Sequence, residues 1–259
     1  MYKDAFSLES LEGKNAVITG SSSGIGRGIA LEMAKRGANL FVMGLEEEGT
    51  WETVRMIREM GGKAEGFVFD VRDDAAIDEF VCEKMKKYGG IDIFVNNAGL
   101  SLTQMDYLET TDEENDAMIK INLYATIRFT KRVIAQMLEH KRGGSILITS
   151  SINGFAPVYV QAVYSATKAA LINLTKSLAY HYGPDGIRVN CIAPGAVHNG
   201  HMPPDAEKNC APRIPLRRFG VPEDIAQTAA FLVSDAAAYI TGTTITIDGG
   251  MSLRRDLFE

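Results

Sequence analysis

A glycine-rich turn between an apolar strand and an amphipathic helix constrains the fold of this chain more than any other feature. Residues 16–19 are apolar or β-branched, and the segment Gly20-Ser21-Ser22-Ser23-Gly24-Ile25-Gly26 follows them directly. Beyond the turn, apolar side chains recur at the spacing of one helix face, at Ile25, Ile29, Ala30, Met33 and Ala34. A strand that passes through glycines into a helix predicts the opening unit of a parallel α/β sheet.

The same alternation of strand and helix continues along the chain. Strands buried on both faces are apolar almost throughout, and alternating strands and helices favour parallel pairing with right-handed crossovers. We therefore expect a Rossmann-type, doubly wound α/β fold with helices on both faces of the sheet, in a single domain over residues 1–259. The expected strands are residues 16–19, 40–43, 66–69, 91–95, 145–149, 188–192 and 244–247, and helices are expected around residues 51–60 and 77–85 and from Thr111 onward.

The glycine-rich turn also predicts a phosphate site. Glycines let the main chain approach a pyrophosphate, and a helix N-terminus presents free N–H groups and the positive end of its dipole. A nucleoside-triphosphate loop would need Gly at position 25 followed by Lys, whereas the chain has Ile25 and Gly26. A tight turn without a ligand is the other alternative. We expect a dinucleotide, bound by Gly20, Ser22, Ser23, Gly24, Ile25 and Gly26.

Composition argues against several other classes of protein. Acidic residues outnumber basic ones by 33 to 27, so the net charge of −6 does not favour nucleic acid or anionic lipid as a partner. Three widely spaced cysteines, Cys82, Cys191 and Cys210, do not form a disulfide pattern. The N-terminus lacks the apolar core of a secretion signal, and no apolar run approaches the roughly 20 residues that span a bilayer. We expect a cytoplasmic protein that binds neither nucleic acid nor membrane.

Two residues four apart on a predicted helix, Tyr164 and Lys168, offer acid–base chemistry. Residues at this spacing share a helix face, so the ammonium group can lie close to the phenol. A phenol titrates near about 10, and a nearby cation lowers its pKa toward a pH at which it can exchange protons. We expect Tyr164 to transfer a proton with its pKa lowered by Lys168; an ordinary surface pair is the alternative.

Together these motifs resemble the short-chain dehydrogenase/reductase family. The turn has the spacing TGxxxGxG, and Asn96-Asn97-Ala98-Gly99, Asn122, Ser151, Tyr164-xxx-Lys168 and Pro194-Gly195 follow in the family's order. Each motif alone is weak, but their joint occurrence over residues 13–250 is specific. The resemblance implies an NAD(P)-dependent oxidoreductase that moves a hydride between nicotinamide and a secondary alcohol or ketone.

The resemblance also implies roles for individual residues. Ser151, thirteen residues before Tyr164, is implied to donate a hydrogen bond to the substrate oxygen, in preference to Ser150. Asn122 is implied to hold a water that connects Lys168 to solvent. Substrate is thus expected to contact Ser151 and Tyr164. Cofactor contacts are implied for Asp70, Val71, Asn97, Ala98, Gly99, Tyr164, Lys168, Pro194, Gly195 and Val197, and for Asn199 where relatives often have threonine.

The end of the second strand predicts which dinucleotide binds. In such folds an acidic residue there binds the ribose of NAD, and a basic residue accepts the phosphate of NADP. This chain has Gly44 and Leu45 instead, and three glutamates follow that would repel a 2′-phosphate. We expect NAD in preference to NADP, with Leu45 beside the cofactor.

The segment from about 194 to 220 is expected to be a long irregular loop that binds the substrate. Its polar composition, with Arg213, Arg217 and Arg218, favours a polar or anionic substrate over a large sterol. Residues 213–220, together with Trp51, loosely resemble the sugar-acid dehydrogenases of the family, including those acting on keto-deoxy-gluconate. His198, His201 and Cys210 lack the spacing of a metal site, so no metal is expected.

Several alternatives stay open at this stage. The NNAG and YSATK motifs are also similar to those of 3-oxoacyl thioester reductases, and hydroxysteroid dehydrogenases belong to the same family. A non-catalytic dinucleotide sensor is an alternative of another class, although such proteins usually lose the tyrosine or the lysine. The resemblance further implies a homotetramer that pairs the helices carrying Asn122 and Tyr164.

Overall fold

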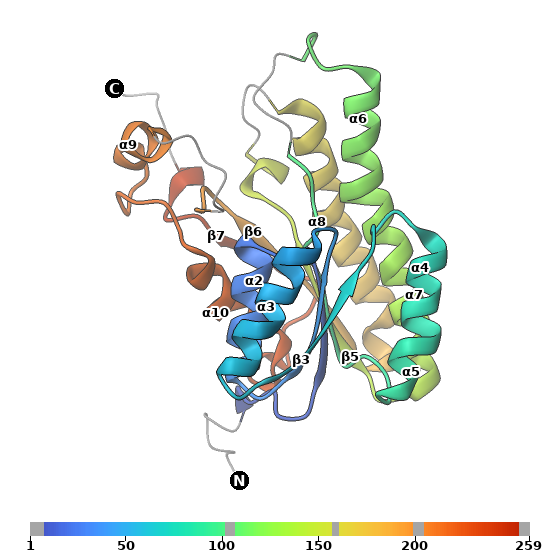
Figure 1. Cartoon of the computed structure of the whole chain (residues 1–259). Coiled ribbons are helices and arrows are strands. Elements are labelled where there is room, and N and C mark those ends of the chain that lie inside the picture. Colours follow the sequence, from blue (N-terminus) through green and yellow to red (C-terminus); the bar gives the residue numbers. More distant parts are fainter. Residues whose placement is uncertain (1–7, 102–106, 157–160, 199–204, 254–259) are drawn as a thin grey trace.

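A seven-stranded parallel sheet forms the centre of the molecule (Figure 1). The computed structural model describes residues 8–101, 107–156, 161–198 and 205–253. The strand order is β3-β2-β1-β4-β5-β6-β7, so the sheet changes winding direction between β1 and β4. The strands are β1 Asn15–Thr19, β2 Asn39–Gly44, β3 Lys63–Val68, β4 Ile93–Asn96, β5 Gly144–Thr149, β6 Ile187–Pro194 and β7 Thr244–Ile247. The expected Rossmann-type, doubly wound fold is confirmed.

All seven expected strands are present; β7 has the predicted ends, and the ends of the other six differ from the prediction. The largest difference is at β3, which begins at Lys63 rather than at Gly66. This strand lies at the edge of the sheet and is only partly buried, so its first half lacks the continuous apolar run by which the central strands were predicted.

Helices cover both faces of the sheet (Figure 1). Successive strand residues point to opposite faces. Ile18 and Val42 therefore pack in the core under one helix layer, and Val17 and Phe41 pack in the core under the other. The first layer is α2 Gly24–Lys35, α3 Glu47–Glu59 and α10 Pro222–Val233, and the second is α4 Asp74–Asp78, η1 Glu79–Lys84, α5 Met85–Lys87, α6 Asp112–Met118, η2 Ile119–Tyr124, α7 Ala125–His140 and α8 Ala162–Tyr182.

The long helix predicted from Thr111 has a defined start and an irregular middle. The Thr111 side chain accepts a hydrogen bond from the main chain of Glu114, and the Glu114 carboxylate accepts one from the main chain of Thr111. This capping box fixes where α6 begins. Between α6 and α7 the chain forms the π-helical segment η2, which contains Asn122. Such segments are frequent at functional sites.

The segment 194–220 is more structured than expected. In its described part it contains the helix α9 Ala206–Cys210 and the short helix η5 Ala211–Arg213. Val197 pairs with Gly220 in a parallel bridge, and a small cluster of Ala211, Ile214 and Phe219 is buried beneath the segment. The remaining short helices are η3 Ile152–Gly154, η4 Gly183–Asp185, η6 Asp235–Ala237 and η7 Met251–Leu253. Within the described ranges, every helix is too short or too polar to cross a membrane.

Candidate active site

A cleft of about 680 Å³ opens at the carboxyl ends of the central strands. Ligands of doubly wound sheets bind at this edge, next to the point where the winding direction changes. The cleft brings together residues that are far apart in the sequence. They are Ser23, Gly24, Ile25 and Gly26, Asn97 and Gly99, Ser151, Tyr164 and Lys168, and Pro194, Gly195 and Val197.

The glycine-rich turn packs main chain against main chain. A Cβ atom on Gly26 would lie 2.2 Å from the carbonyl oxygen of Gly20, so no other residue fits there. Gly20 itself has a φ of +63°, and its carbonyl accepts a hydrogen bond from the Asn97 side chain at 3.1 Å. The side chain of Ser23, the residue before α2, makes no capping hydrogen bond to the first turn of that helix. The N-terminal N–H groups of α2 are therefore left for an anion in the cleft.

Two of the residues expected to bind the dinucleotide, Gly20 and Ser22, lie behind the part of the turn that lines the cleft. Ser22 is 9% exposed, and its carbonyl accepts a hydrogen bond from the Arg27 guanidinium. Neither Ser22 nor Gly20 is among the described residues that line the cleft. Ser23 to Gly26 are the part of the turn that faces the cleft.

The adjacent serines after β5 have different partners. The Ser150 hydroxyl is buried and donates a hydrogen bond to the main-chain carbonyl of Lys168 at 2.8 Å. The Ser151 hydroxyl accepts a hydrogen bond from the N–H of Asn153 at 3.2 Å and is also hydrogen-bonded to the hydroxyl of Tyr164. Ser151 is thus the serine whose hydroxyl lies next to the phenol.

Lys168 is buried behind Tyr164. Its side-chain nitrogen donates a hydrogen bond to the carbonyl of Thr149 at 3.0 Å and lies 5.5 Å from the centre of the Tyr164 ring. Burial disfavours the charged amine and lowers the pKa of Lys168 to about 8, an effect that Cys191 partly opposes. The lysine therefore holds or releases its proton within the range of ordinary working pH.

The pKa of Tyr164 differs from the sequence-based expectation. Burial of the phenol raises this pKa above its ordinary value, and the hydrogen bond with Ser151 acts in the opposite direction. We expected Lys168 to lower it. In the structure the nearest hydrogen-bonding partner of the phenol is the serine, because the Lys168 amine is turned toward Thr149.

Asn122 joins the helix η2 to the loop after β4. It is fully buried; its Oδ1 accepts a hydrogen bond from the N–H of Leu100 at 2.7 Å, and its Nδ2 donates one to the Leu100 carbonyl at 2.9 Å. A Cβ atom on Gly99 would lie 3.3 Å from Asn122 Oδ1 and 3.4 Å from Lys168 Nζ. Gly99, Asn122 and Lys168 therefore converge at one end of the cleft.

Comparison with known proteins identifies the family. A family model described as enoyl-(acyl carrier protein) reductase matches residues 20–252. The 3beta-hydroxysteroid dehydrogenase 1 of Eggerthella lenta is 40% identical over 254 residues, which cover 95% of this chain and 96% of that protein. The chain belongs to the short-chain dehydrogenase/reductase family. It is an oxidoreductase that acts on secondary alcohols or ketones with NAD(P).

Other members of the family show how wide its substrate range is. The 3-oxoacyl-[acyl-carrier-protein] reductase of Thermotoga maritima is 38% identical, over 93% of this chain and 98% of that one. The structure of a proposed 2-deoxy-D-gluconate 3-dehydrogenase from Agrobacterium tumefaciens, with bound NADP, superposes with a TM-score of 0.87 at 34% identity and covers 95% of this chain and 99% of that one. A 7 alpha-hydroxysteroid dehydrogenase in complex with NADH and 7-oxo glycochenodeoxycholic acid superposes with a TM-score of 0.89 at 30% identity, covering 96% of this chain and 98% of that chain.

The residues of this dehydrogenase fit a dinucleotide. The crowded turn at Gly26 and the uncapped N-terminus of α2 offer main-chain N–H groups to a pyrophosphate. Gly195 is also crowded, since a Cβ atom there would lie 2.7 Å from that of Asp248, so the chain passes the cleft wall without a side chain. Of the remaining residues expected to contact the cofactor, Ala98 packs against Gly20, and Asn199 lies outside the described residues.

Three further residues expected to contact the cofactor do not line the described cleft. Leu45 is exposed at the end of β2, and Val71 is only partly buried beyond β3. The Asp70 carboxylate accepts hydrogen bonds from the Arg72 guanidinium, one of them at 2.9 Å, which lowers the pKa of Asp70. This carboxylate is therefore already paired with an arginine, whereas the family resemblance implied that Asp70 contacts the cofactor.

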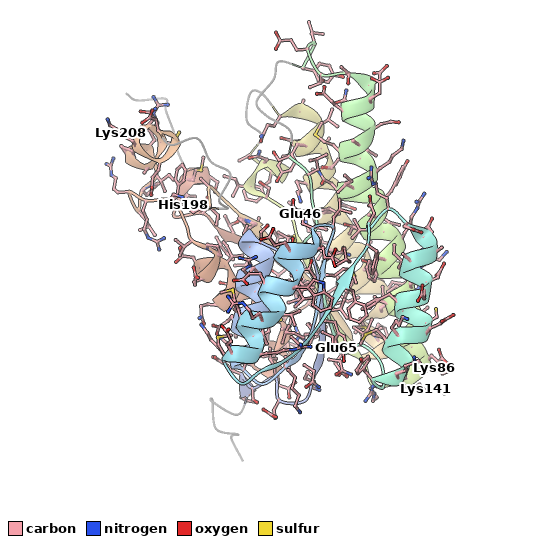
Figure 2. The ribbon with its side chains drawn as sticks, viewed as in Figure 1. Glu46, Glu65, Lys86, Lys141, His198 and Lys208 are labelled. Atoms are coloured by element: carbon pink, nitrogen blue, oxygen red, sulfur yellow. The ribbon has the colours of Figure 1, made fainter. Side chains whose placement is uncertain are left out.

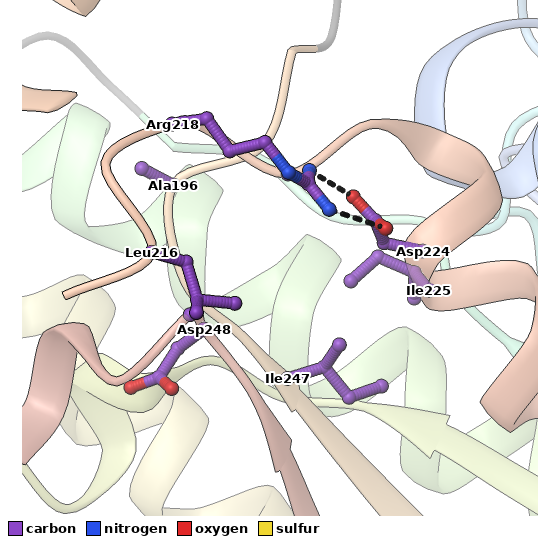
Figure 3. A pocket seen from close by; sticks show the side chains of 9 residues that line it. Ala196, Leu216, Arg218, Asp224, Ile225, Ile247 and Asp248 are labelled. Carbon is purple, nitrogen blue, oxygen red and sulfur yellow. Dashed lines mark hydrogen bonds and ion pairs between the residues drawn. The ribbon is translucent and has the colours of Figure 1, made fainter. Parts of the chain in front are cut away.

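The arginines that we expected to favour an anionic substrate do not line the described cleft either. Arg218 forms an ion pair with Asp224 at the edge of a separate pocket of about 160 Å³ (Figure 3). The Arg217 guanidinium donates to the carbonyl of Pro212, and Arg213 is exposed. Among the described residues that line the cleft, Lys168 is the only charged one.

The loop histidine His198 also has a partner. Its Nε2 lies 3.0 Å from the carboxylate of Glu207. Figure 2 labels His198 in the same part of the molecule as Lys208. His201 lies outside the described residues. Among the described residues, no three His, Cys, Asp or Glu side chains are grouped so that they could hold a metal ion.

Sequence reasoning missed several residues that line the cleft. They are Leu100, Ser101, Thr149, Ile152, Asn153, Gln161, Ala196 and Met251. Two of them could have been found by their position, because Asn153 follows Ser151 by two residues and Gln161 precedes Tyr164 by three. No composition or periodicity signal marks them.

Proposed function

We propose that this dehydrogenase interconverts a polar secondary alcohol and its ketone, of the sugar or sugar-acid class, with NAD as the preferred cofactor. The observation that carries this proposal is the chemistry of the cleft beyond Ser151 and Tyr164. Ser101, Asn153 and Gln161 contribute a hydroxyl and two amide groups there, whereas a sterol would require a wide apolar wall.

In this proposal, four residues carry the reaction. The nicotinamide, when bound, supplies the site that accepts or donates the hydride. Tyr164 takes the proton from the alcohol or returns it to the ketone oxygen, and Ser151 donates a hydrogen bond to that oxygen as charge develops on it. Lys168, with a pKa of about 8, exchanges the proton with the phenol. Asn122 holds the loop at Leu100 beside the lysine and, as the family resemblance implies, a water on the path to solvent.

The preference for NAD rests on the residues after β2. Leu45 offers no positive charge to a 2′-phosphate, and Glu46, Glu47 and Glu48 are exposed where α3 begins, with Glu46 marked in Figure 2. Acidic side chains at this place repel a phosphate and favour the plain ribose.

Assembly and location complete the proposal. We propose a single-domain subunit that forms a cytoplasmic homotetramer through α7 and α8, as the family resemblance implies. Exposed apolar side chains on these helices support such pairing, because Ile127 is 39% exposed and Tyr180 is 90% exposed.

Nicotinamide absorbance tests the proposal directly. Purified protein is assayed with sugar acids, neutral sugars and polyols, sterols and 3-oxoacyl thioesters, each with NAD(H) and NADP(H) in the appropriate direction. The proposal predicts turnover of at least one polyhydroxy compound, with a higher kcat/KM for NAD(H). Activity confined to sterols or to thioesters would contradict the proposal. A protein that binds NADH tightly but turns over none of these substrates would instead be a non-catalytic dinucleotide sensor.

A further inference from the structure

A chain of three polar side chains crosses one wall of the cleft. Asn153 Nδ2 donates a hydrogen bond to Gln161 Oε1 at 2.6 Å, and Gln161 Nε2 donates one to Ser101 Oγ at 3.2 Å. Asn153 lies in η3 after β5, Gln161 directly precedes α8, and Ser101 lies in the loop after β4. All three line the same cleft as Ser151 and Tyr164.

Asn153 is held rigidly at the inner end of this chain. The residue is 9% exposed and lies within the short helix η3, and its N–H donates to the hydroxyl of Ser151 at 3.2 Å. A buried amide is costly unless its groups find hydrogen-bonding partners. Its Nδ2 has Gln161, and the side chain starts directly beside the serine that faces the phenol.

Gln161 holds the outer end. It stands immediately before α8, but its side chain does not cap that helix among the described residues. Instead it turns across the cleft, toward Asn153 on one side and Ser101 on the other. The Gln161 amide therefore forms part of the cleft wall and does not cap α8.

We propose that Asn153 and Gln161 form a subsite that recognises a hydroxyl group next to the reacting carbon, so that the substrate is a hydroxyketone or a vicinal diol. This inference rests on the proposed function. Ser151 and Tyr164 bind the reacting oxygen, and the Asn153 amide lies one step along the wall, where the oxygen on the adjacent carbon falls. An amide pair can both donate to and accept from a hydroxyl.

The subsite recognises a neutral group. Among the described residues that line the cleft, Lys168 is the sole charged one, and its nitrogen is directed at the carbonyl of Thr149. A carboxylate beside the reacting carbon would meet amides and hydroxyls but no cation. The subsite is thus suited to a hydroxyl rather than to an acid group at this position.

Two ketones that differ by one hydroxyl test the inference. Reduction of 2-hydroxycyclohexanone and of cyclohexanone is followed by NADH absorbance for the wild type, Gln161→Leu and Asn153→Leu. Gln161→Glu keeps an acceptor for Asn153 and serves as the conservative variant. Gln227→Leu is the matched control, because Gln227 is an exposed glutamine on α10 that does not line the cleft.

The wild type is expected to prefer the hydroxyketone by about tenfold or more in kcat/KM, since a site built for a hydroxyl rejects the analogue that lacks it. Gln161→Leu and Asn153→Leu are expected to lose this preference, because kcat/KM falls about tenfold more for the hydroxyketone, which loses a hydrogen bond to the enzyme, than for cyclohexanone, which loses none. Gln161→Glu keeps part of the preference, and Gln227→Leu keeps all of it.

Three other results would overturn the inference. A wild type that reduces both ketones equally well recognises no hydroxyl. Variants that lose activity on both ketones in parallel show a structural role, and Gln161→Glu distinguishes this case if a leucine variant does not fold. A wild type that reduces neither ketone but turns over a polyhydroxy compound lacks the subsite, whereas a wild type that turns over neither these ketones nor any polyhydroxy compound contradicts the proposed function, which separates the two failures.

Discussion

The buried hydroxyl of Ser150 donates a hydrogen bond to the main-chain carbonyl of Lys168 at 2.8 Å. The side chain of the same lysine donates to the carbonyl of Thr149 at 3.0 Å. A Cβ atom on Gly154 would lie 3.0 Å from the Lys168 carbonyl oxygen, so the turn after β5 also packs closely against α8. These two hydrogen bonds and the close packing at Gly154 hold α8 against the end of β5 at Lys168. They therefore keep Tyr164 facing Ser151.

The adjacent serines are predicted to respond differently to substitution. Ser150→Ala removes a buried hydrogen bond and is expected to lower the free energy of unfolding by about 1 kcal/mol. Ser151→Ala is expected to lower kcat about 10²- to 10³-fold, as loss of a hydrogen-bond donor to a developing oxyanion does. Urea unfolding and steady-state kinetics on both variants measure this. Equal catalytic loss in the two variants would contradict the assignment of Ser151.

The contribution of Lys168 to the stability of the protein is predicted to rise with pH above about 8. Burial lowers the pKa of folded Lys168 to about 8 from its ordinary value of 10.5, so between these values the unfolded state binds more protons. The full difference corresponds to about 3 kcal/mol, gained progressively across this window and absent below it. Urea unfolding from pH 7 to 9.5 on wild type and Lys168→Met measures it. The free energy of unfolding of Lys168→Met should lack this rise. If the free energy of unfolding depends on pH with the same slope in both proteins, the prediction is wrong.

The pH dependence of alcohol oxidation is predicted to depend on Ser151. Burial raises the pKa of Tyr164, while the hydrogen bond from Ser151 lowers it. Oxidation needs the phenolate, so its rate should rise with pH. In Ser151→Ala the rising limb should move to higher pH, because only the effect of burial remains. The profile of kcat/KM against pH measures this shift, and a limb that moves to lower pH would show that the serine stabilises the protonated phenol.

Cofactor preference is predicted to respond to residue 45. Leu45→Arg places a cation at the exposed end of β2 and should raise kcat/KM for NADP about tenfold, with little effect on NAD. Leu45→Gln is the uncharged control. Gly44→Asp should instead destabilise the fold, because a Cβ atom there would lie 2.6 Å from the hydroxyl of Thr50. If kcat/KM for NADP is the same in Leu45→Arg as in the wild type, the adenosine ribose does not bind beside residue 45.

The central strands and the glycine-rich turn could be predicted because burial on both faces leaves a simple apolar signal. β1 and β4 are buried throughout, are apolar except at their ends and pair at the winding change, whereas β3, partly exposed at the edge, begins three residues earlier than predicted. The capping box at Thr111 likewise follows from local chemistry. The helix α9 was missed, because its five residues are too few for helical periodicity to show.

The site was predictable only in part. Spacing along one helix places Tyr164 and Lys168 together, but it does not tell which partner each finds across the fold. The Lys168 amine bonds to a carbonyl of β5, and Arg218 bonds to Asp224 rather than facing the cleft. Asn153 and Gln161 became visible as a pair only when the end of β5 and the start of α8 were placed side by side.

The most direct test is the activity of Tyr164→Phe together with its affinity for NADH. The hydroxyl of Tyr164 is the proposed proton donor and acceptor, so its removal should lower kcat by about 10²- to 10⁴-fold while NADH, followed by its fluorescence, still binds. Urea unfolding confirms that the variant is folded. A folded Tyr164→Phe protein that binds NADH and turns over as fast as the wild type would contradict the account.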